Sequence, residues 1–187
     1  MKGIIFDCDG TLADTMPAHY ESWLETLRPF GVQFPEEQFW ALGGWSAAAI
    51  ARRLSEESGV PLDPEHIAQE KNRTYVRYLP TVQPIPEVVA VAREYHGKLP
   101  MAVATGSSRW LCEEILRRLD VAGLFDAVVA IEDVEHHKPA PDSFLEAARR
   151  IHVPPADCLV YEDTDAGIEA ARRAGMAFVD VRLLRGR

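Results

Sequence analysis

Residues 3–12 read GIIFDCDGTL, a short apolar run that meets two aspartates and a glycine. Apolar residues 3–6 have the length and composition of a buried strand. In extended backbone, residues two apart point to the same side, so the carboxylates of Asp7 and Asp9 would project together at the carboxyl end of this strand. Taken alone, Asp-x-Asp-Gly is also an ordinary solvated turn, but its position at the end of a buried strand favours a site.

Further apolar runs with the character of buried strands recur along the chain, at residues 101–104, 127–131, 158–161 and 177–181. Segments with helical spacing separate them, at residues 109–119, 142–151 and 165–174. Strands that alternate with helices predict an α/β fold, a Rossmann-like parallel sheet covered on both faces.

Residues 15–80 break this alternation. They contain successive amphipathic stretches, at residues 16–30, 36–42, 47–59 and 64–79, and no strand-like run. Prolines between residues 80 and 86 stiffen the return, and a helix over residues 86–96 leads back into the sheet. We therefore expect a core of residues 1–14 and 81–187 and an all-helical cap domain of residues 15–80, inserted after the first strand.

Two of the later predicted strands are followed by groups that could hold a phosphate. Thr105 offers a hydroxyl, and Gly106 and Ser107 offer backbone N–H groups just before a helix begins. Lys138 lies in a loop stiffened by Pro139 and Pro141, where it could neutralise phosphate. The alternatives are an ordinary turn with a helix cap and a solvated surface lysine.

A second acidic pair, Glu162-Asp163, follows the predicted strand at residues 158–161. Neighbouring carboxylates repel one another and favour a shared proton or a divalent cation. Oxygen ligands beside a phosphate suit Mg²⁺ better than Zn²⁺. Because the carboxyl ends of parallel strands meet at one edge, where open sheets bind ligands, these groups should gather there with the first acidic pair.

Composition excludes several other classes of protein. The 187 residues are 47% hydrophobic and carry 20 basic against 29 acidic side chains, a formal net charge of −9, with no basic stripe to bind nucleic acid. Three cysteines without C-x-x-C spacing predict neither a disulfide framework nor structural zinc. The first apolar run is too short for a signal peptide or a membrane span. We expect a cytoplasmic protein, monomeric because no coiled-coil repeat is present, with neither nucleic acid nor membrane as partner.

The ordered motifs around Asp7, Thr105, Lys138 and Asp163 resemble those of haloacid dehalogenase (HAD) phosphohydrolases, and the match spans essentially the whole chain. The helical insertion resembles the cap of the β-phosphoglucomutase-like subgroup, nearest to bacterial fructose-1-phosphate and 6-phosphogluconate phosphatases. The resemblance implies that Asp7 is the nucleophile and forms an aspartyl-phosphate. It implies that Asp9 is the acid and base, and that Thr105 and Lys138 hold the phosphoryl group. Its implied Mg²⁺ site is formed by Asp7, Asp9, Glu162 and Asp163, with Glu162 supporting the water shell of the metal.

The same resemblance assigns substrate contacts in the cap. His19 falls where related enzymes place a partner for the acid/base aspartate, and Lys71 where they place a phosphate-contacting lysine. Gly44, Trp45 and Ser46 resemble a substrate-contacting loop, in which Trp45 offers a flat face to a sugar. The alternatives are a surface histidine, a solvated lysine and a buried core tryptophan.

One departure from the subgroup separates hydrolysis from mutase activity. Mutases carry an arginine after the loop serine, whereas Ala47 follows Ser46 here, so the second phosphate of a bisphosphate lacks its clamp. We therefore expect a magnesium-dependent phosphatase of small phosphomonoesters such as fructose 1-phosphate, with a β-phosphoglucomutase as the alternative. A dehalogenase needs neither Asp9 nor a magnesium site. A phosphorylation-dependent receiver or a non-catalytic phosphate-binding protein are alternatives from other classes.

Overall fold

The computed structural model describes residues 1–42 and 45–185. Within them, a parallel sheet of five strands has the order β5-β4-β1-β6-β7. The strands are β1 (Gly3–Phe6), β4 (Met101–Ala104), β5 (Ala127–Val129), β6 (Cys158–Glu162) and β7 (Ala177–Asp180). The predicted α/β class with a parallel sheet is therefore confirmed. All four residues of β1 are buried, as expected for a central strand covered on both faces.

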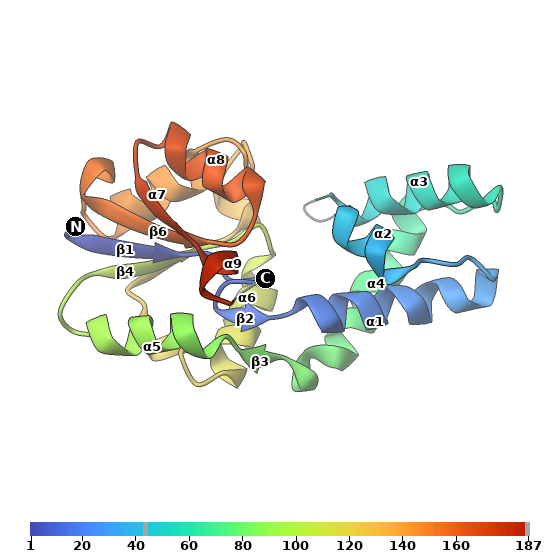
Figure 1. Cartoon of the computed structure of the whole chain (residues 1–187), viewed down its shortest axis with the longest axis horizontal. Helices are drawn as coiled ribbons and strands as arrows, with labels where there is room; N and C mark the ends of the chain where they lie inside the picture. Colours follow the sequence, from blue (N-terminus) through green and yellow to red (C-terminus); the bar gives the residue numbers. More distant parts are fainter. Residues whose placement is uncertain (43–44, 186–187) are drawn as a thin grey trace. The chain divides into compact units, whose positions relative to one another are not determined.

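Helices cover both faces of this sheet, with α7 and α8 on one face and α5 and α6 on the other (Figure 1). Their bounds are α5 (Pro86–Tyr95), α6 (Arg109–Arg118), α7 (Asp142–Arg150), α8 (Asp165–Arg173) and, at the end of the described chain, α9 (Val181–Leu184). Phe144, Ala147, Ala148 and Ile151 recur at helical spacing, and all four belong to the buried core between α7 and the sheet. Short 3-10 turns occupy Arg28–Phe30, Leu79–Thr81, Ala122–Leu124, Ile131–Asp133 and Pro155–Asp157.

The chain divides into two compact units, one formed by Met1–Asp14 with Gln83–Arg187 and the other by Thr15–Val82. The second unit is helical, with α1 (Met16–Leu27), α2 (Glu36–Ala41), α3 (Ala47–Ser58) and α4 (Pro64–Tyr78). It has its own hydrophobic core, which includes Trp23, Phe34, Phe39, Leu54 and Ile67. Each unit thus has a hydrophobic core of its own, as expected for a structural domain.

A two-residue antiparallel ladder, β2 (Ala13–Asp14) with β3 (Gln83–Pro84), lies where the chain leaves and re-enters the first unit. No pattern in the sequence predicts this ladder. Two-residue strands show no periodicity, and Pro84 argues against a strand because it cannot donate to a ladder. The pairing keeps the two ends of the insertion beside each other.

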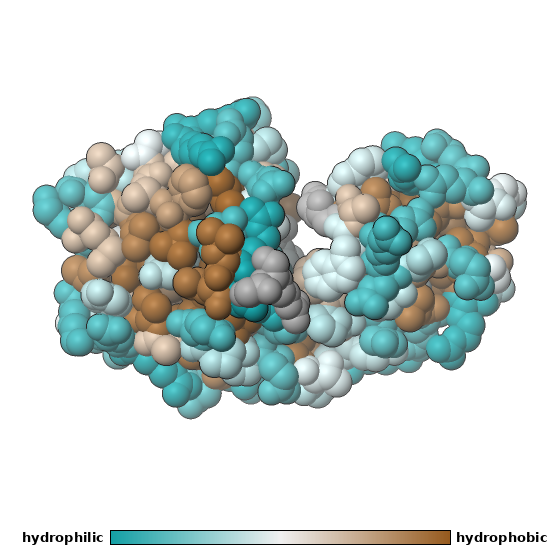
Figure 2. Space-filling view, in the orientation of Figure 1, coloured by the Kyte–Doolittle hydropathy of each residue, from teal (hydrophilic) through white to brown (hydrophobic). Residues whose placement is uncertain are grey.

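Several large apolar side chains are exposed among the described residues. Figure 2 shows apolar atoms at the surface near α9, where Leu183 and Leu184 are exposed. Among the helices of residues 1–42 and 45–185, none combines the length and the apolar composition needed to span a bilayer.

Candidate active site

The carboxyl ends of three adjacent strands bring the predicted site residues of the first unit together. Asp7 directly follows β1, Thr105 directly follows β4, and Glu162 is the last residue of β6. The backbone N–H of Asp7 donates to the carbonyl of Tyr161 at 3.0 Å, which continues the sheet up to the acidic residue. The predicted gathering at one sheet edge is therefore present.

Lys138 lies among carboxylates, and its side chain is only 13% exposed. Its ammonium group donates to Asp7 Oδ1 and to Glu162 Oε2, both at 2.7 Å, and to the carbonyl of Ala104 at 3.2 Å. Burial opposes its charge, but Asp7 and Glu162 outweigh this effect and raise the pKa of Lys138. The alternative of a solvated surface lysine is wrong.

Asp7, Glu162 and Asp163 each offer a carboxylate oxygen, and these oxygens lie within 4.8 Å of one another. Burial, followed by the charge of Glu162, raises the pKa of Asp163 to about 7. Burial also raises the pKa of Asp7, although Lys138 opposes the shift. The excess of buried negative charge and the purely oxygen donor set fit a hard divalent cation such as Mg²⁺.

Two glycines let these carboxylates approach the backbone closely. Gly10 has a φ of +85°, and a Cβ there would lie 2.1 Å from Asp163 Oδ2. A Cβ on Gly167, in the first turn of α8, would lie 2.0 Å from the carboxyl carbon of Glu162. Any larger residue would displace the carboxylate. Gly167 was not among the predicted site residues, although a glycine inside a helical pattern is a signal for close packing.

Glu162 is held by more hydrogen bonds than the motif alone suggests. Its Oε1 accepts from the N–H groups of Asp163 at 3.1 Å and Thr164 at 2.9 Å, and from the Thr164 hydroxyl at 2.8 Å. Its Oε2 accepts from Lys138. Both oxygens are therefore engaged, and the carboxylate is placed to orient the lysine. Thr164, which sequence reasoning passed over, fixes this arrangement and also caps α8.

Asp9 meets the predicted hydroxyl loop. The Ser107 hydroxyl donates to Asp9 Oδ2 at 2.7 Å, and the Thr105 hydroxyl donates to the same oxygen at 3.4 Å. The N–H of Ser107 donates to the Thr105 hydroxyl at 3.0 Å, which orders the loop around Gly106. These contacts place the second aspartate and the loop that follows β4 side by side.

Within the helical unit, His19 and Lys71 are brought into contact. Lys71 is 5% exposed, and its ammonium donates to His19 Nδ1 at 2.6 Å. The His19 ring stacks on Tyr75 with a centroid distance of 3.9 Å and an interplanar angle of 4°. The alternative of a solvated Lys71 is wrong. Sequence reasoning missed Tyr75, four residues after Lys71 on the same face of α4.

The predicted substrate loop of the helical unit is described in part, because Gly44 lies outside the described residues. Trp45 is 49% exposed and lies 5.8 Å from the guanidinium of Arg53, so the alternative of a buried core tryptophan is wrong. The Ser46 hydroxyl accepts from the N–H of Ala49 at 3.2 Å and caps α3. Ala47, which stands where the mutases of the resembling subgroup carry an arginine, is the first residue of α3.

The chain is similar in sequence and in structure to known enzymes. Residues 1–175 match the family model of haloacid dehalogenase-like hydrolases. The chain is 47% identical to the fructose-1-phosphate phosphatase YqaB of Escherichia coli over 97% of both chains. It is 30% identical to the β-phosphoglucomutase of Bacillus subtilis, over 97% of this chain and 83% of that protein. The crystal structure of CbbY from Rhodobacter sphaeroides in complex with phosphate superposes with a TM-score of 0.81 at 27% identity, covering 95% of this chain and 84% of that one.

Proposed function

This chain belongs to the haloacid dehalogenase-like hydrolase family, and we propose that it is a magnesium-dependent phosphatase of small sugar phosphomonoesters, foremost fructose 1-phosphate. The observation that carries the proposal is the near full-length 47% identity to a fructose-1-phosphate phosphatase. The buried group of Asp7, Lys138, Glu162 and Asp163 supports the chemistry.

In the first step of the proposed reaction, a carboxylate oxygen of Asp7 attacks phosphorus and the bond from phosphorus to the sugar oxygen breaks. Asp9, protonated at this stage, gives its proton to the departing sugar oxygen. The product on the enzyme is an aspartyl-phosphate, which divides hydrolysis into two easier steps. In the second step, the Asp9 carboxylate takes a proton from water and the water oxygen attacks phosphorus. The bond between phosphorus and the Asp7 oxygen breaks, which frees the Asp7 carboxylate and inorganic phosphate.

The remaining groups hold the charges that this reaction needs. We assign the metal to the carboxylates of Asp7 and Asp163 and the backbone carbonyl of Asp9, with Glu162 orienting Lys138 and supporting the water shell of the metal. When bound, Mg²⁺ would neutralise the negative charge shared by these carboxylates and the phosphoryl oxygens. Lys138 and Thr105 bind phosphoryl oxygens. Such positioning and charge neutralisation supply most of the catalysis in phosphoryl transfer.

For the cap we propose substrate recognition by residues 44–46 and by the pair of His19 and Lys71. Lys71 contributes a buried positive charge to an otherwise acidic protein, which suits an anionic ligand. Trp45 offers an exposed ring to a sugar. Because Ala47 provides no guanidinium for a second phosphate, the chain favours hydrolysis over the mutase reaction of its Bacillus relative. The free, buried cysteines fit a reducing compartment, so we place the enzyme in the cytoplasm. We also propose that it acts as a monomer.

The test is phosphate release with Mg²⁺ from fructose 1-phosphate and 6-phosphogluconate, with Asp7→Asn as the blank. β-Glucose 1-phosphate is assayed in parallel for conversion to glucose 6-phosphate. Release that requires Mg²⁺ and is lost in the variant supports the proposal and identifies the preferred sugar. Isomer formation without release would instead establish a mutase, and no turnover of any substrate would indicate a binding protein.

A further inference from the structure

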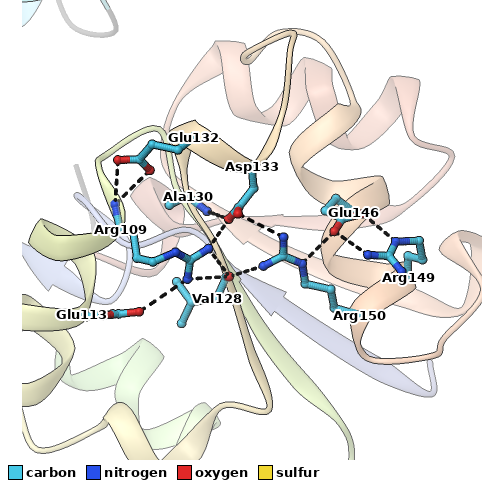
Figure 3. Close-up of polar contacts among 9 residues, drawn as sticks. All are labelled: Arg109, Glu113, Val128, Ala130, Glu132, Asp133, Glu146, Arg149 and Arg150. Atoms are coloured by element: carbon cyan, nitrogen blue, oxygen red, sulfur yellow. Dashed lines mark hydrogen bonds and ion pairs between the residues drawn. The ribbon is translucent and has the colours of Figure 1, made fainter.

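In the first unit, two arginines from different helices meet one carboxylate (Figure 3). Arg109 is the first residue of α6, Arg150 is the last residue of α7, and Asp133 ends the 3-10 turn that follows β5. Figure 3 shows both guanidinium groups converging on the Asp133 side chain and on the carbonyl of Val128. We call these residues the Asp133 junction.

The junction is fully hydrogen-bonded around its carboxylate. Asp133 Oδ2 accepts from the N–H of Ala130 at 2.8 Å and from the guanidinium of Arg109, while Oδ1 pairs with Arg150 at 3.1 Å. The Val128 carbonyl accepts from Arg150 at 2.8 Å and from Arg109 at 3.3 Å. Burial opposes the charge of Asp133, but its hydrogen bonds to Ala130 and the arginines outweigh this effect and lower its pKa.

This junction joins the two segments that supply phosphate-binding groups. The loop with Thr105 and Ser107 runs directly into Arg109, and the loop with Lys138 begins directly after Asp133. The same segments meet again where the N–H of Ile131 donates to the Ser107 carbonyl at 3.1 Å. They meet a third time where the N–H of Arg109 donates to the Glu132 carboxylate at 3.1 Å.

The exposure and the contacts of the Asp133 junction indicate that it fixes the positions of the two loops more than it stabilises the folded state. The Asp133 side chain is 17% exposed and the arginines that pair with it are 39% and 28% exposed, so solvent screens part of the ion pairing and reduces its contribution to the free energy of unfolding. The contacts of Asp133 with Arg109 and Arg150 link three chain segments, which are the turn after β5, the start of α6 and the end of α7. In phosphoryl transfer, small displacements of such groups are costly because catalysis depends on geometry.

We infer that Asp133 is a positioning residue for phosphoryl transfer. Through its ion pairs with Arg109 and Arg150, it fixes the position of the Thr105–Ser107 loop relative to the Lys138 loop. It acts through these residues and does not touch the substrate. The inference rests on the proposed phosphatase function.

The test compares Asp133→Asn with Glu114→Gln. The first removes the charge while keeping an oxygen acceptor for Ala130. The second is a matched control, because the Glu114 carboxylate also pairs with two arginines, Arg117 and Arg118, and its side chain is 19% exposed. All three residues belong to α6, so these ion pairs link no separate chain segments. We expect Asp133→Asn to lower kcat for fructose 1-phosphate by about ten- to a hundredfold with a smaller change in KM, and Glu114→Gln to leave both unchanged.

Hydrogen exchange measured by mass spectrometry provides a readout that does not depend on turnover. Asp133→Asn should accelerate exchange in residues 105–108 and 131–138 together, and combining it with Arg109→Gln should add no further loss of kcat. A lower melting temperature with unchanged kcat, or faster exchange in one of the two segments alone, overturns the inference. If the unmodified enzyme releases no phosphate from any substrate, the proposed function fails, and the exchange pattern alone decides whether Asp133 couples the loops.

Discussion

At the scale of single residues, Gly167 lies so close to the Glu162 carboxylate that there is no room for a Cβ atom. Alanine normally stabilises a helix relative to glycine by about 1 kcal/mol. Here the added Cβ would lie 2.0 Å from the carboxyl carbon of Glu162, which would have to move away from Lys138. We expect Gly167→Ala to lower the free energy of unfolding by about 1–3 kcal/mol and to reduce kcat as well.

Denaturant unfolding and phosphate release measure these two effects. The matched control is Gly123→Ala, because a Cβ at that position meets no atom within 4 Å. Near-neutral behaviour of both variants would show that Glu162 relaxes freely and that its contact with Lys138 is unimportant.

Asp163 connects metal affinity to pH. Its pKa is raised to about 7, so the metal-free folded state holds a proton that the unfolded state releases near the ordinary value of 3.8. This proton favours the metal-free fold at low pH, and the advantage is lost as pH rises through 7. Because Mg²⁺ needs the ionised carboxylate, its apparent affinity should fall about tenfold for each pH unit below 7.

Thermal melts with a Mg²⁺ titration at pH 6, 7 and 8 measure this linkage. Asp163→Asn should abolish the response to Mg²⁺ at every pH. An affinity for Mg²⁺ that stays constant between pH 6 and 8 would contradict the assignment of the raised pKa to a metal ligand.

The residues found from sequence and those missed differ in whether a recognisable sequence pattern marks their place in the fold. Asp7, Asp9 and Glu162-Asp163 were predictable because each pair directly follows a strand-like run, and strand ends of a parallel sheet share one edge. Asp133 was missed because its partners lie on α6 and α7, and nothing in its local sequence indicates them. Long-range partners of this kind are defined only once the elements pack.

At the scale of elements, Ser46 was predicted to contact substrate but is observed as the N-cap of α3, and substitutions can separate the two roles. Its hydroxyl caps α3, so Ser46→Ala should destabilise the helical unit by about 1 kcal/mol, whereas Ser46→Asn should retain the cap. If Ser46 also contacts substrate, KM for fructose 1-phosphate rises in both variants. Unfolding followed by fluorescence, together with steady-state kinetics, separates the roles, and unchanged stability of the alanine variant would contradict the capping role.

Periodicity predicted the long elements well and the shortest ones not at all. The helix expected over residues 109–119 is observed as Arg109–Arg118, and the strand expected over residues 127–131 ends at Val129 because a 3-10 turn begins at Ile131. Long amphipathic segments repeat their signal over several turns, whereas β2 and β3 have two residues each and depend on each other for pairing.

At the scale of the whole molecule, the tryptophans divide between the two units in a useful way. Trp23, Trp40 and Trp45 belong to the helical unit, where Trp23 is buried, while Trp110 in the other unit is 58% exposed. Fluorescence during unfolding therefore reports mainly on the helical unit, and far-ultraviolet circular dichroism reports on both. Since the proposed metal ligands belong to the first unit, Mg²⁺ at ten times its Kd should stabilise that unit by about 1.4 kcal/mol.

Denaturant titrations followed by both signals check this prediction. We expect Mg²⁺ to shift part of the dichroism transition and to leave the fluorescence midpoint in place. Equal shifts of both midpoints would mean that the units unfold as one cooperative structure.

The position of β1 in the sheet also has a consequence for synthesis of the chain. This strand leaves the ribosome first, yet its neighbours β4 and β6 are made only after the whole helical insertion. The insertion is continuous in sequence and can fold while the nascent chain is still growing, whereas Gly3–Phe6 has no strand partner until β4 is made and keeps one open edge until β6 is made. The strand that precedes the proposed nucleophile Asp7 is thus the one that waits longest for its partners during translation, and its open edge is available to chaperones and to misassociation.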